Sequence, residues 1–289
     1  MRRLLACFVL LALCAAAPAR AGDEPVDLEL IIAVDVSWSV DATEARLQRE
    51  GYVTAFTDPE VVEAIQSGFL GKIAVLYFEW AGMGHDKVVQ DWTLISDEAG
   101  ATAFAARLSK ARYETGYRTS ISEAIDFAAP RFVGNGYEGR RKVIDISGDG
   151  ANNYGRLVTL ARDDAVNQGI TINGLPILSD ASGEFDRAWT PNLDLYYEHC
   201  VIGGRGAFVV AANGFQDFAA AIRQKLVLEI ADLAPVKRRP ATRHASVSPL
   251  ILIQAPAPAG ESGDGRSIPP CDIGERRWMY QYRTGPSLP

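Results

Sequence analysis

Three oxygen-bearing side chains alternate at the end of an apolar run near the N-terminus. The segment 28–34 is almost wholly apolar, and Asp35, Ser37 and Ser39 follow it in the pattern D-x-S-x-S. In an extended chain alternate residues point to the same side, so one carboxylate and two hydroxyls can converge. These hard oxygen ligands suit Mg²⁺, Mn²⁺ or Ca²⁺ and suit Zn²⁺ poorly. The pattern alone is weak, because Ser and Asp are also common where helices begin.

Two later segments supply further oxygen ligands. Thr119 lies just before an expected helix at residues 120–129, and Asp149 directly follows an expected strand at residues 142–147. In open α/β sheets ligands bind beyond the carboxyl ends of the strands, and both segments belong there if the strands are parallel. The sequence therefore predicts a single divalent-metal site formed by Asp35, Ser37, Ser39, Thr119 and Asp149.

The hydrophobic pattern predicts strands that alternate with helices. Apolar runs predict strands at residues 28–34, 72–78, 87–94, 142–147, 170–177 and 207–211. Helical spacing and capping residues predict helices after Asp41, over 101–111, 120–129 and 156–167, and after Asn213. This order predicts a Rossmann-like, doubly wound α/β fold with helices on both faces of a mainly parallel sheet. The hairpin formed by the second and third strands would add one antiparallel edge strand.

The same residues carry a family resemblance. Over about residues 26–232 the chain resembles von Willebrand factor type A domains, on the strength of their metal-ion-dependent adhesion site: Asp35-x-Ser37-x-Ser39, Thr119 and Asp149-Gly150. The stretches RTSISEAI, IDISGDGANN and YYEHCVIGGRGAFVV are similar to an uncharacterised bacterial group of exported type A proteins. Family members often have Thr-Asp-Gly where this chain has Gly148 before Asp149, which loosens the loop but keeps the carboxylate.

The resemblance also implies roles for the five residues. Ser37, Ser39 and Thr119 would bind the metal directly, whereas Asp35 and Asp149 would act mostly through bound water. Three hydroxyls leave the shell of Mg²⁺ incomplete and the charge of the ion under-neutralised. A carboxylate of a protein partner can then replace a water molecule, which favours metal-dependent protein binding.

A metal-dependent hydrolase is the alternative function, and a structural domain whose metal only steadies loops is a third. A hydrolase needs a base or nucleophile beside the metal. The three histidines, His85, His199 and His244, lie away from the motif in the expected topology, and the sequence has no G-x-S-x-G elbow, P-loop or C-x-x-C. The sequence therefore favours a non-enzymatic module. The formal net charge of −7 disfavours nucleic-acid binding.

The two ends of the chain differ in composition from the middle. Residues 1–21 have a basic start, an apolar centre and an Ala-Arg-Ala end, as a signal peptide has, which predicts export to the periplasm or the medium. Residues 22–233 form the expected domain, with no transmembrane segment. Residues 234–289 hold nine of the fifteen prolines and are expected to form a flexible tail, although residues 271–282 could dock on the domain. Cys200 and Cys271 either pair or stay free.

Three residues near the motif have two possible roles each. Trp38 could be an exposed contact beside the metal or part of the core. Asp145 interrupts an apolar strand, so it is expected to be structural and to need a buried partner. Glu79 ends the second strand and could tune the site, but a solvated loop acid is the favoured interpretation.

Overall fold

The computed structural model describes residues 22–178, 190, 192–231, 252–254 and 265–276. Within these residues the main sheet has seven strands in the order β4-β3-β2-β6-β7-β8-β9, and a small parallel sheet joins β1 to β5. The strands are β1 (Glu24–Val26), β2 (Leu28–Asp35), β3 (Ile73–Trp80), β4 (Asp86–Ile95), β5 (Tyr137–Gly139), β6 (Lys142–Gly148), β7 (Thr171–Pro176), β8 (Phe208–Val210) and β9 (Leu252–Gln254).

The sheet is mainly parallel, as the sequence predicts. Strand β2 lies at its centre, and pairs in parallel with β3 on one side and β6 on the other. All eight residues of β2 are buried, which explains its nearly continuous apolar sequence. Strand β4 is antiparallel to β3, so the expected antiparallel edge strand is confirmed. At the opposite edge β9 is antiparallel to β8, a pairing that the sequence analysis does not predict.

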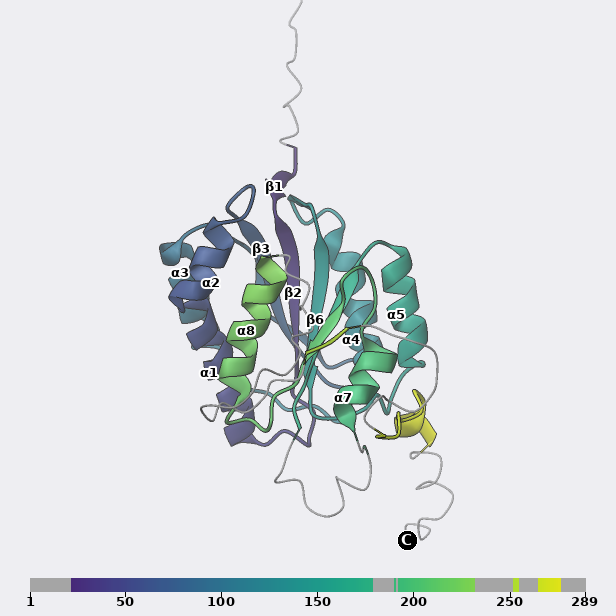
Figure 1. Ribbon diagram of the computed structural model, residues 1–289. Coiled ribbons are helices and arrows are strands. Elements are labelled where there is room, and N and C mark those ends of the chain that lie inside the picture. Colours follow the sequence, from purple (N-terminus) through teal and green to yellow (C-terminus); the bar gives the residue numbers. More distant parts are fainter. Residues whose placement is uncertain (1–21, 179–189, 191, 232–251, 255–264, 277–289) are drawn as a thin grey trace, which may run out of the picture.

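Helices cover both faces of the sheet (Figure 1). One face packs against α1 (Ala42–Phe56), α2 (Pro59–Gln66), α3 (Glu98–Leu108) and α8 (Phe218–Ile230). The other face packs against α4 (Ile121–Ala128), the 3₁₀ turn η1 (Ala129–Phe132), α5 (Val158–Asn167), α7 (Leu193–Tyr196) and the π-helical turn η2 (Tyr197–Val201). Each face therefore has its own hydrophobic core, as a doubly wound fold requires.

Local capping explains where the helices begin. The predicted capping box of α1 is confirmed: Asp41 accepts from the Glu44 amide at 2.9 Å, and Glu44 accepts from the Asp41 amide at 2.9 Å. The predicted cap of the last helix at Asn213 is wrong, because α8 begins only at Phe218. Gly214 has a φ of +81°, outside the helical region, and so breaks the expected first turn.

The C-terminal part of the chain meets the domain at a disulfide. Cys200 in η2 forms a disulfide with Cys271, with Cα atoms 5.3 Å apart. Of the two alternatives for these cysteines, paired or free, the structure has the pair. Cys271 and Ile273 pack against the core on that face. The predicted signal peptide and the predicted boundary at residue 233 both lie outside the described residues. In the described residues no helix is long and apolar enough to cross a bilayer.

Candidate metal centre

The five predicted residues lie on three loops at the carboxyl ends of the central strands. Asp35 is the last residue of β2, and the next residues turn at once, since the Val40 amide donates to the Ser37 carbonyl at 2.9 Å. Ser37 forms an isolated parallel bridge with Gly116, which brings the loop before α4 alongside. Asp149 directly follows β6, the neighbour of β2. The parallel pairing therefore brings all three loops to one edge of the sheet.

Four of the five side chains are linked through their oxygen atoms. The Ser37 and Ser39 hydroxyl oxygens are 3.1 Å apart. The Ser39 hydroxyl donates to Asp149 Oδ1 at 2.7 Å, and the Thr119 hydroxyl donates to Ser37 Oγ at 3.4 Å. Asp35 joins through the backbone, because its Oδ1 accepts from the Ser37 amide at 2.7 Å. The structure thus brings together residues that are up to 114 positions apart in the sequence.

Asp35 is the most deeply buried member of the cluster. Burial, and secondarily the charge of Asp149, raises the pKa of Asp35 well above its ordinary value. Its Oδ2 atom is buried without a hydrogen-bond partner among the described residues. A buried carboxylate oxygen of this kind is costly unless a proton or a cation compensates it. The surroundings of Asp35 therefore suit a carboxylate whose charge is compensated by a bound cation or proton.

Tyr197 explains the glycine at position 148. A Cβ atom on Gly148 would lie 2.9 Å from both Asp35 Oδ2 and the Tyr197 hydroxyl. The Tyr197 hydroxyl thus lies beside the cluster, and its pKa is raised by burial and by the charges of Asp35 and Asp149. The tyrosine therefore takes the space that a larger residue before Asp149 would need. Sequence analysis missed Tyr197, which lies in the YYEHC stretch that contributed to the family resemblance.

Two asparagines that the sequence analysis did not single out fix the loop positions. Asn153 Oδ1 accepts from the Thr119 amide at 3.0 Å, and the Asn153 amide donates to the Thr119 carbonyl at 2.8 Å. Asn152 Oδ1 accepts from the Ser122 amide at 2.9 Å. Both residues follow Asp149 in the stretch GDGANN. Their closeness to Asp149 in the sequence was the one feature that could have identified them as part of the site.

The oxygen cluster fits a hard divalent cation. Ligands at about 2.1 Å from an octahedral Mg²⁺ are about 3.0 Å apart when adjacent. The hydroxyl and carboxylate contacts of the cluster, at 2.7–3.4 Å, bracket this separation. In the described part of the chain no three His, Cys, Asp or Glu side chains group to hold a metal, so any ion here depends on the hydroxyls. Hydroxyl ligands favour Mg²⁺ over softer metals.

Two exposed aromatic residues stand at the rim of the cluster. Trp38, between the two serines, is 75% exposed, so the exposed alternative is correct and the core alternative is wrong. Tyr117 is 68% exposed and meets Trp38 edge to face, with ring centroids 5.9 Å apart. Arg118 follows in the left-handed region with a φ of +69°, which turns the chain between Tyr117 and Thr119. Single exposed hydrophobic residues are common, but two exposed aromatics in mutual contact form a small apolar patch beside the cluster.

Glu79 and Asp145, the other two residues considered near the motif, have structural roles. The interpretation of Glu79 as a solvated acid is wrong: it is buried and forms an ion pair with Arg49 of α1. Asp145 has the buried partner that its position required, Lys225 of α8, with Glu229 bonded to the same ammonium at 2.6 Å. Helix α8 therefore supplies a positive charge that the apolar pattern of the strand does not reveal.

The histidines differ in their distance from the cluster. His85 lies nearer than expected, because a Cβ on Gly116 would approach its ring to 2.9 Å and Gly116 pairs with Ser37. His199 lies in η2 next to the disulfide-bonded Cys200, and burial lowers its pKa. His244 is outside the described residues.

Comparison with known proteins establishes the family. The model of the family described as "Protein of unknown function (DUF1194)" matches residues 25–234. The chain belongs to this family. The matched region contains every residue of the oxygen cluster and all the described helices except the short turn near residue 275. No curated protein matches the sequence.

Solved structures share the fold at low identity. They include the pilus adhesin SpaC from Lactobacillus rhamnosus GG, with a TM-score of 0.50 and 11% identity over 74% of this chain and 32% of that one. Proximal thread matrix protein 1 from the mussel byssus, with a zinc-occupied MIDAS motif, has a TM-score of 0.47 and 12% identity over 71% and 46%. A von Willebrand factor type A protein from Catenulispora acidiphila has a TM-score of 0.44 and 14% identity over 73% and 42%.

The DUF1194 chain spans less than half the length of each of these three proteins. The predicted resemblance is nonetheless confirmed at the level of the fold. The mainly parallel sheet with an antiparallel edge and helices on both faces is the arrangement that the resemblance to von Willebrand factor type A domains implies, and the pilus adhesin shares this fold.

Proposed function

We propose that this protein is an exported module that binds a divalent cation and, through the cation, an acidic residue of a protein partner. Ser37, Ser39 and Thr119 supply hydroxyl oxygens to the cation, and Asp35 and Asp149 supply negative charge around it. The observation that carries the proposal is the convergence of these five side chains from three loops. Mg²⁺ is the proposed ion, with Mn²⁺ or Ca²⁺ as substitutes.

The balance of charge favours binding to a carboxylate. Neutral hydroxyls do not cancel the charge of a divalent ion, and the two carboxylates of the cluster cancel it in full only if both contact the ion directly. Asp35 is deeply buried, whereas Ser39 is exposed and Asp149 is partly exposed. A partner can therefore reach the cation from the Ser39 side. A carboxylate from that partner would gain a strong, poorly screened attraction there.

The exposed aromatic pair gives the partner a second contact. Trp38 and Tyr117 border the open side of the cluster and offer flat apolar surface next to the charged centre. Tryptophan and tyrosine are enriched among the residues that dominate binding energies at protein interfaces. The proposed partner segment therefore carries an apolar side chain close to its acidic residue.

A non-enzymatic role suits the surroundings of the cluster better than hydrolysis. Burial and the charges of Asp35 and Asp149 raise the pKa of Tyr197, so its hydroxyl stays protonated at neutral pH and does not serve as a base or nucleophile. Glu79 is engaged by Arg49. Turnover of a phosphoester or peptide substrate that is lost on Asp149→Ala would instead support the hydrolase alternative.

A pull-down from the exported fraction tests the proposal. Wild-type protein with Mg²⁺ should retain a partner that is lost in EDTA and absent with Asp35→Ala. Thr119→Ala should weaken partner binding more than metal binding, as the family resemblance implies for this hydroxyl. A partner that binds equally well in EDTA, or to a folded Asp35→Ala variant, would place recognition elsewhere.

Export has its own test, because the signal peptide is a proposal from sequence alone. N-terminal sequencing of protein recovered outside the cytoplasm should start near Gly22. Exported protein that retains residues 1–21 would contradict cleavage at this site.

A further inference from the structure

The C-terminal residues 265–276, here called the clamp, are bonded to the domain near the loop that follows Asp149. Cys271 is bonded to Cys200 across 71 positions of sequence. Arg266 forms an ion pair with the buried carboxylate of Asp194 at 2.7 Å. Asn192 Nδ2 donates to the Ser267 carbonyl at 2.9 Å. The clamp is thus fixed to α7 and η2 by one covalent bond and two polar contacts.

The clamp also contacts the loop that carries Asp149. Asn152 Nδ2 donates to Glu275 Oε1 at 2.7 Å. Gly274 lies so close to the same residue that a Cβ atom on it would come within 1.9 Å of the Asn152 carbonyl oxygen. The Tyr196 hydroxyl accepts from the Asn152 amide at 3.2 Å and lies 3.5 Å from the Cys271 carbonyl, to which it can donate. Three contacts therefore meet on Asn152.

Asn152 also connects the clamp to the neighbouring loop, which carries Thr119. Its Oδ1 atom accepts from the Ser122 amide at the start of α4, and the adjacent Asn153 holds the backbone of Thr119 through two hydrogen bonds. Asn152 Nδ2 also donates to the Arg156 carbonyl at 3.1 Å. A side chain without a hydrogen-bond donor at position 152 would lose this contact. Hydrogen bonds therefore join the loop from Asp149 to the loop of Thr119.

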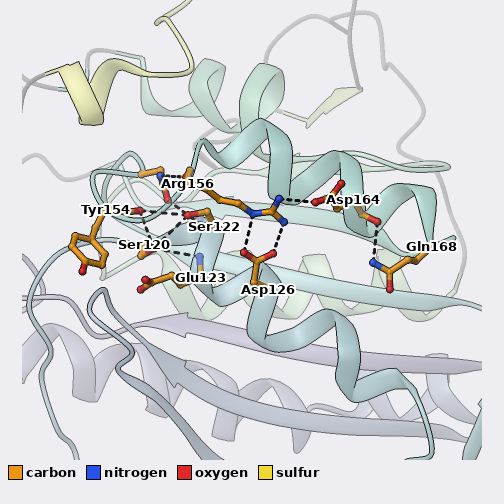
Figure 2. Close-up of polar contacts among 9 residues, drawn as sticks. Ser120, Ser122, Glu123, Asp126, Tyr154, Arg156, Asp164 and Gln168 are labelled. Carbon is orange, nitrogen blue, oxygen red and sulfur yellow. Dashed lines mark hydrogen bonds and ion pairs between the residues drawn. The ribbon is translucent and has the colours of Figure 1, made fainter.

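The far end of this loop is held by charges. Figure 2 shows Arg156 between α4 and α5, with its guanidinium ion-paired to Asp126 on α4 and to Asp164 on α5, at 2.6 Å in each case. Ser120 and Ser122 approach the Tyr154 carbonyl in the same view, with the Ser120 hydroxyl at 2.9 Å. The Arg156 end is thus anchored to helices of the domain, whereas the Asn152 end is held both by the domain and, through Glu275 and Gly274, by the clamp.

We propose that the clamp is part of the metal centre, with Glu275 and Asn152 as positioning residues that hold Thr119 and Asp149 in place for the cation. This inference rests on the proposed function for its metal-binding consequence. Its structural core, the dependence of the two loops on the clamp, stands on the contacts of Asn152 alone. The disulfide keeps the clamp near Asn152, so the tail is needed for a well-ordered site.

Four variants of the full chain test this role. Glu275→Ala removes the acceptor for Asn152, Glu275→Gln keeps an oxygen acceptor, and Gly274→Ala forces the clamp away from the Asn152 carbonyl. Arg276→Ala is the matched control, since its exposed side chain pairs with Asp272 inside the clamp. Amide hydrogen exchange is measured first without metal, over residues 119–122 and 149–153. Mn²⁺ affinity is then measured by titration.

Glu275→Ala and Gly274→Ala should exchange about fivefold faster in both loops, as the loss of one hydrogen bond implies. They should bind Mn²⁺ about tenfold more weakly, the usual effect of losing a residue that orients metal ligands. Glu275→Gln and Arg276→Ala should resemble wild type in both measurements. Unchanged exchange in both disruptive variants, equal loosening by Arg276→Ala, or faster exchange with unchanged Mn²⁺ affinity would overturn the proposal. Wild-type protein that binds no Mn²⁺, with the exchange pattern intact, would refute the proposed function and leave the loop dependence standing.

Discussion

Ser37 and Ser39 have the same hydroxyl in different surroundings. Ser37 is buried and its hydroxyl contacts both Ser39 and Thr119, whereas Ser39 is exposed and donates to Asp149. Neither hydroxyl supports a hydrophobic core. Their removal should therefore affect metal binding much more than folding, because small changes at such positions usually alter stability by less than about 1 kcal/mol.

Ser37→Ala and Ser39→Ala should each weaken Mg²⁺ binding about tenfold or more, since each removes one oxygen from the proposed shell. Calorimetric titration measures the affinity, and thermal unfolding checks the fold. Ser109→Ala, at the end of α3, is the control because its hydroxyl only bonds a helix carbonyl. Unchanged affinity in both serine variants would remove these hydroxyls from the metal site.

Trp38 separates metal binding from partner binding. Trp38→Ala should leave Mg²⁺ affinity unchanged, because the indole supplies no ligand, and should weaken partner binding about tenfold or more, as loss of an interface tryptophan commonly does. Phe69→Ala is a matched control with an 82% exposed ring away from the cluster. Surface plasmon resonance with the captured partner gives the partner affinity of each variant, and calorimetric titration gives its Mg²⁺ affinity. Equal partner affinity of the two variants would show that the aromatic rim is not part of the interface.

At the scale of elements, a buried ion-pair cluster joins α8 to β6. Lys225 and Asp145 are fully buried, and Glu229 and Asn173 complete the group, with Asn173 Nδ2 donating to Glu229 at 2.9 Å. Such clusters add little net stability but are costly to break, since removal of one partner leaves a buried charge. The cluster fixes the position of α8 against the strand that leads to Asp149.

This cluster predicts a pH dependence of stability. Burial, and then the charge of Glu229, raises the pKa of Asp145 to about 7, although Lys225 opposes the shift. The folded state therefore holds this proton more tightly than the unfolded state, whose pKa is near 3.8. The contribution of Asp145 to stability is greatest at acid pH and is lost as the pH rises from about 4 to about 7, by at most about 1.4 kcal/mol per pH unit.

Urea unfolding in EDTA across this range measures the dependence. The free energy of unfolding of Asp145→Asn should fall less steeply between pH 4 and 7 than that of wild type, because the variant lacks the titrating group. Parallel curves for the two proteins would mean that Asp145 does not take up a proton on folding.

Elements with a strong local pattern were predictable, and those that depend on distant partners were not. The apolar run that forms β2 and the capping box of α1 are readable because burial and capping act over a few residues. The start of α8 was misplaced because Gly214 breaks the helix after Asn213. The roles of Lys225, Tyr197 and Glu275 needed the fold itself, since their partners lie far away in sequence. The convergence of the five oxygen-bearing residues was predictable, because each follows a strand or precedes a helix at one edge of the sheet. Their role as metal ligands stays a prediction.

At the scale of the whole molecule, the disulfide joins the domain to a segment that composition alone assigns to a tail. It closes a loop of 71 residues, which in the chain-entropy account contributes about 4 kcal/mol. Within the part of the chain that the structure describes, the two hydrophobic cores are built almost entirely from residues up to Ile230, with Cys271 and Ile273 packed against one of them. The domain should therefore fold without the tail but be less stable.

Cys271→Ser should lower the free energy of unfolding by about 2–4 kcal/mol while keeping one cooperative transition. Removal of the chain from Ala234 onward, which also deletes β9 and the clamp, should lower it further but keep one cooperative transition. Guanidinium unfolding under non-reducing conditions gives the values, and mass spectrometry of the intact wild type shows the two missing hydrogens of the disulfide. Loss of cooperative unfolding in the truncated protein would make the C-terminal part essential to the fold.

The central claim is that the oxygen cluster holds a divalent cation, and a crystal grown with Mn²⁺ tests it most directly. Manganese scatters anomalously, so its position is found independently of how the surrounding side chains are interpreted. We predict one strong anomalous peak in contact with the hydroxyl oxygens of Ser37, Ser39 and Thr119, and no such peak in a folded Asp35→Ala variant. A wild-type crystal in saturating Mn²⁺ with no peak at this cluster, or with its peak elsewhere, would contradict the account.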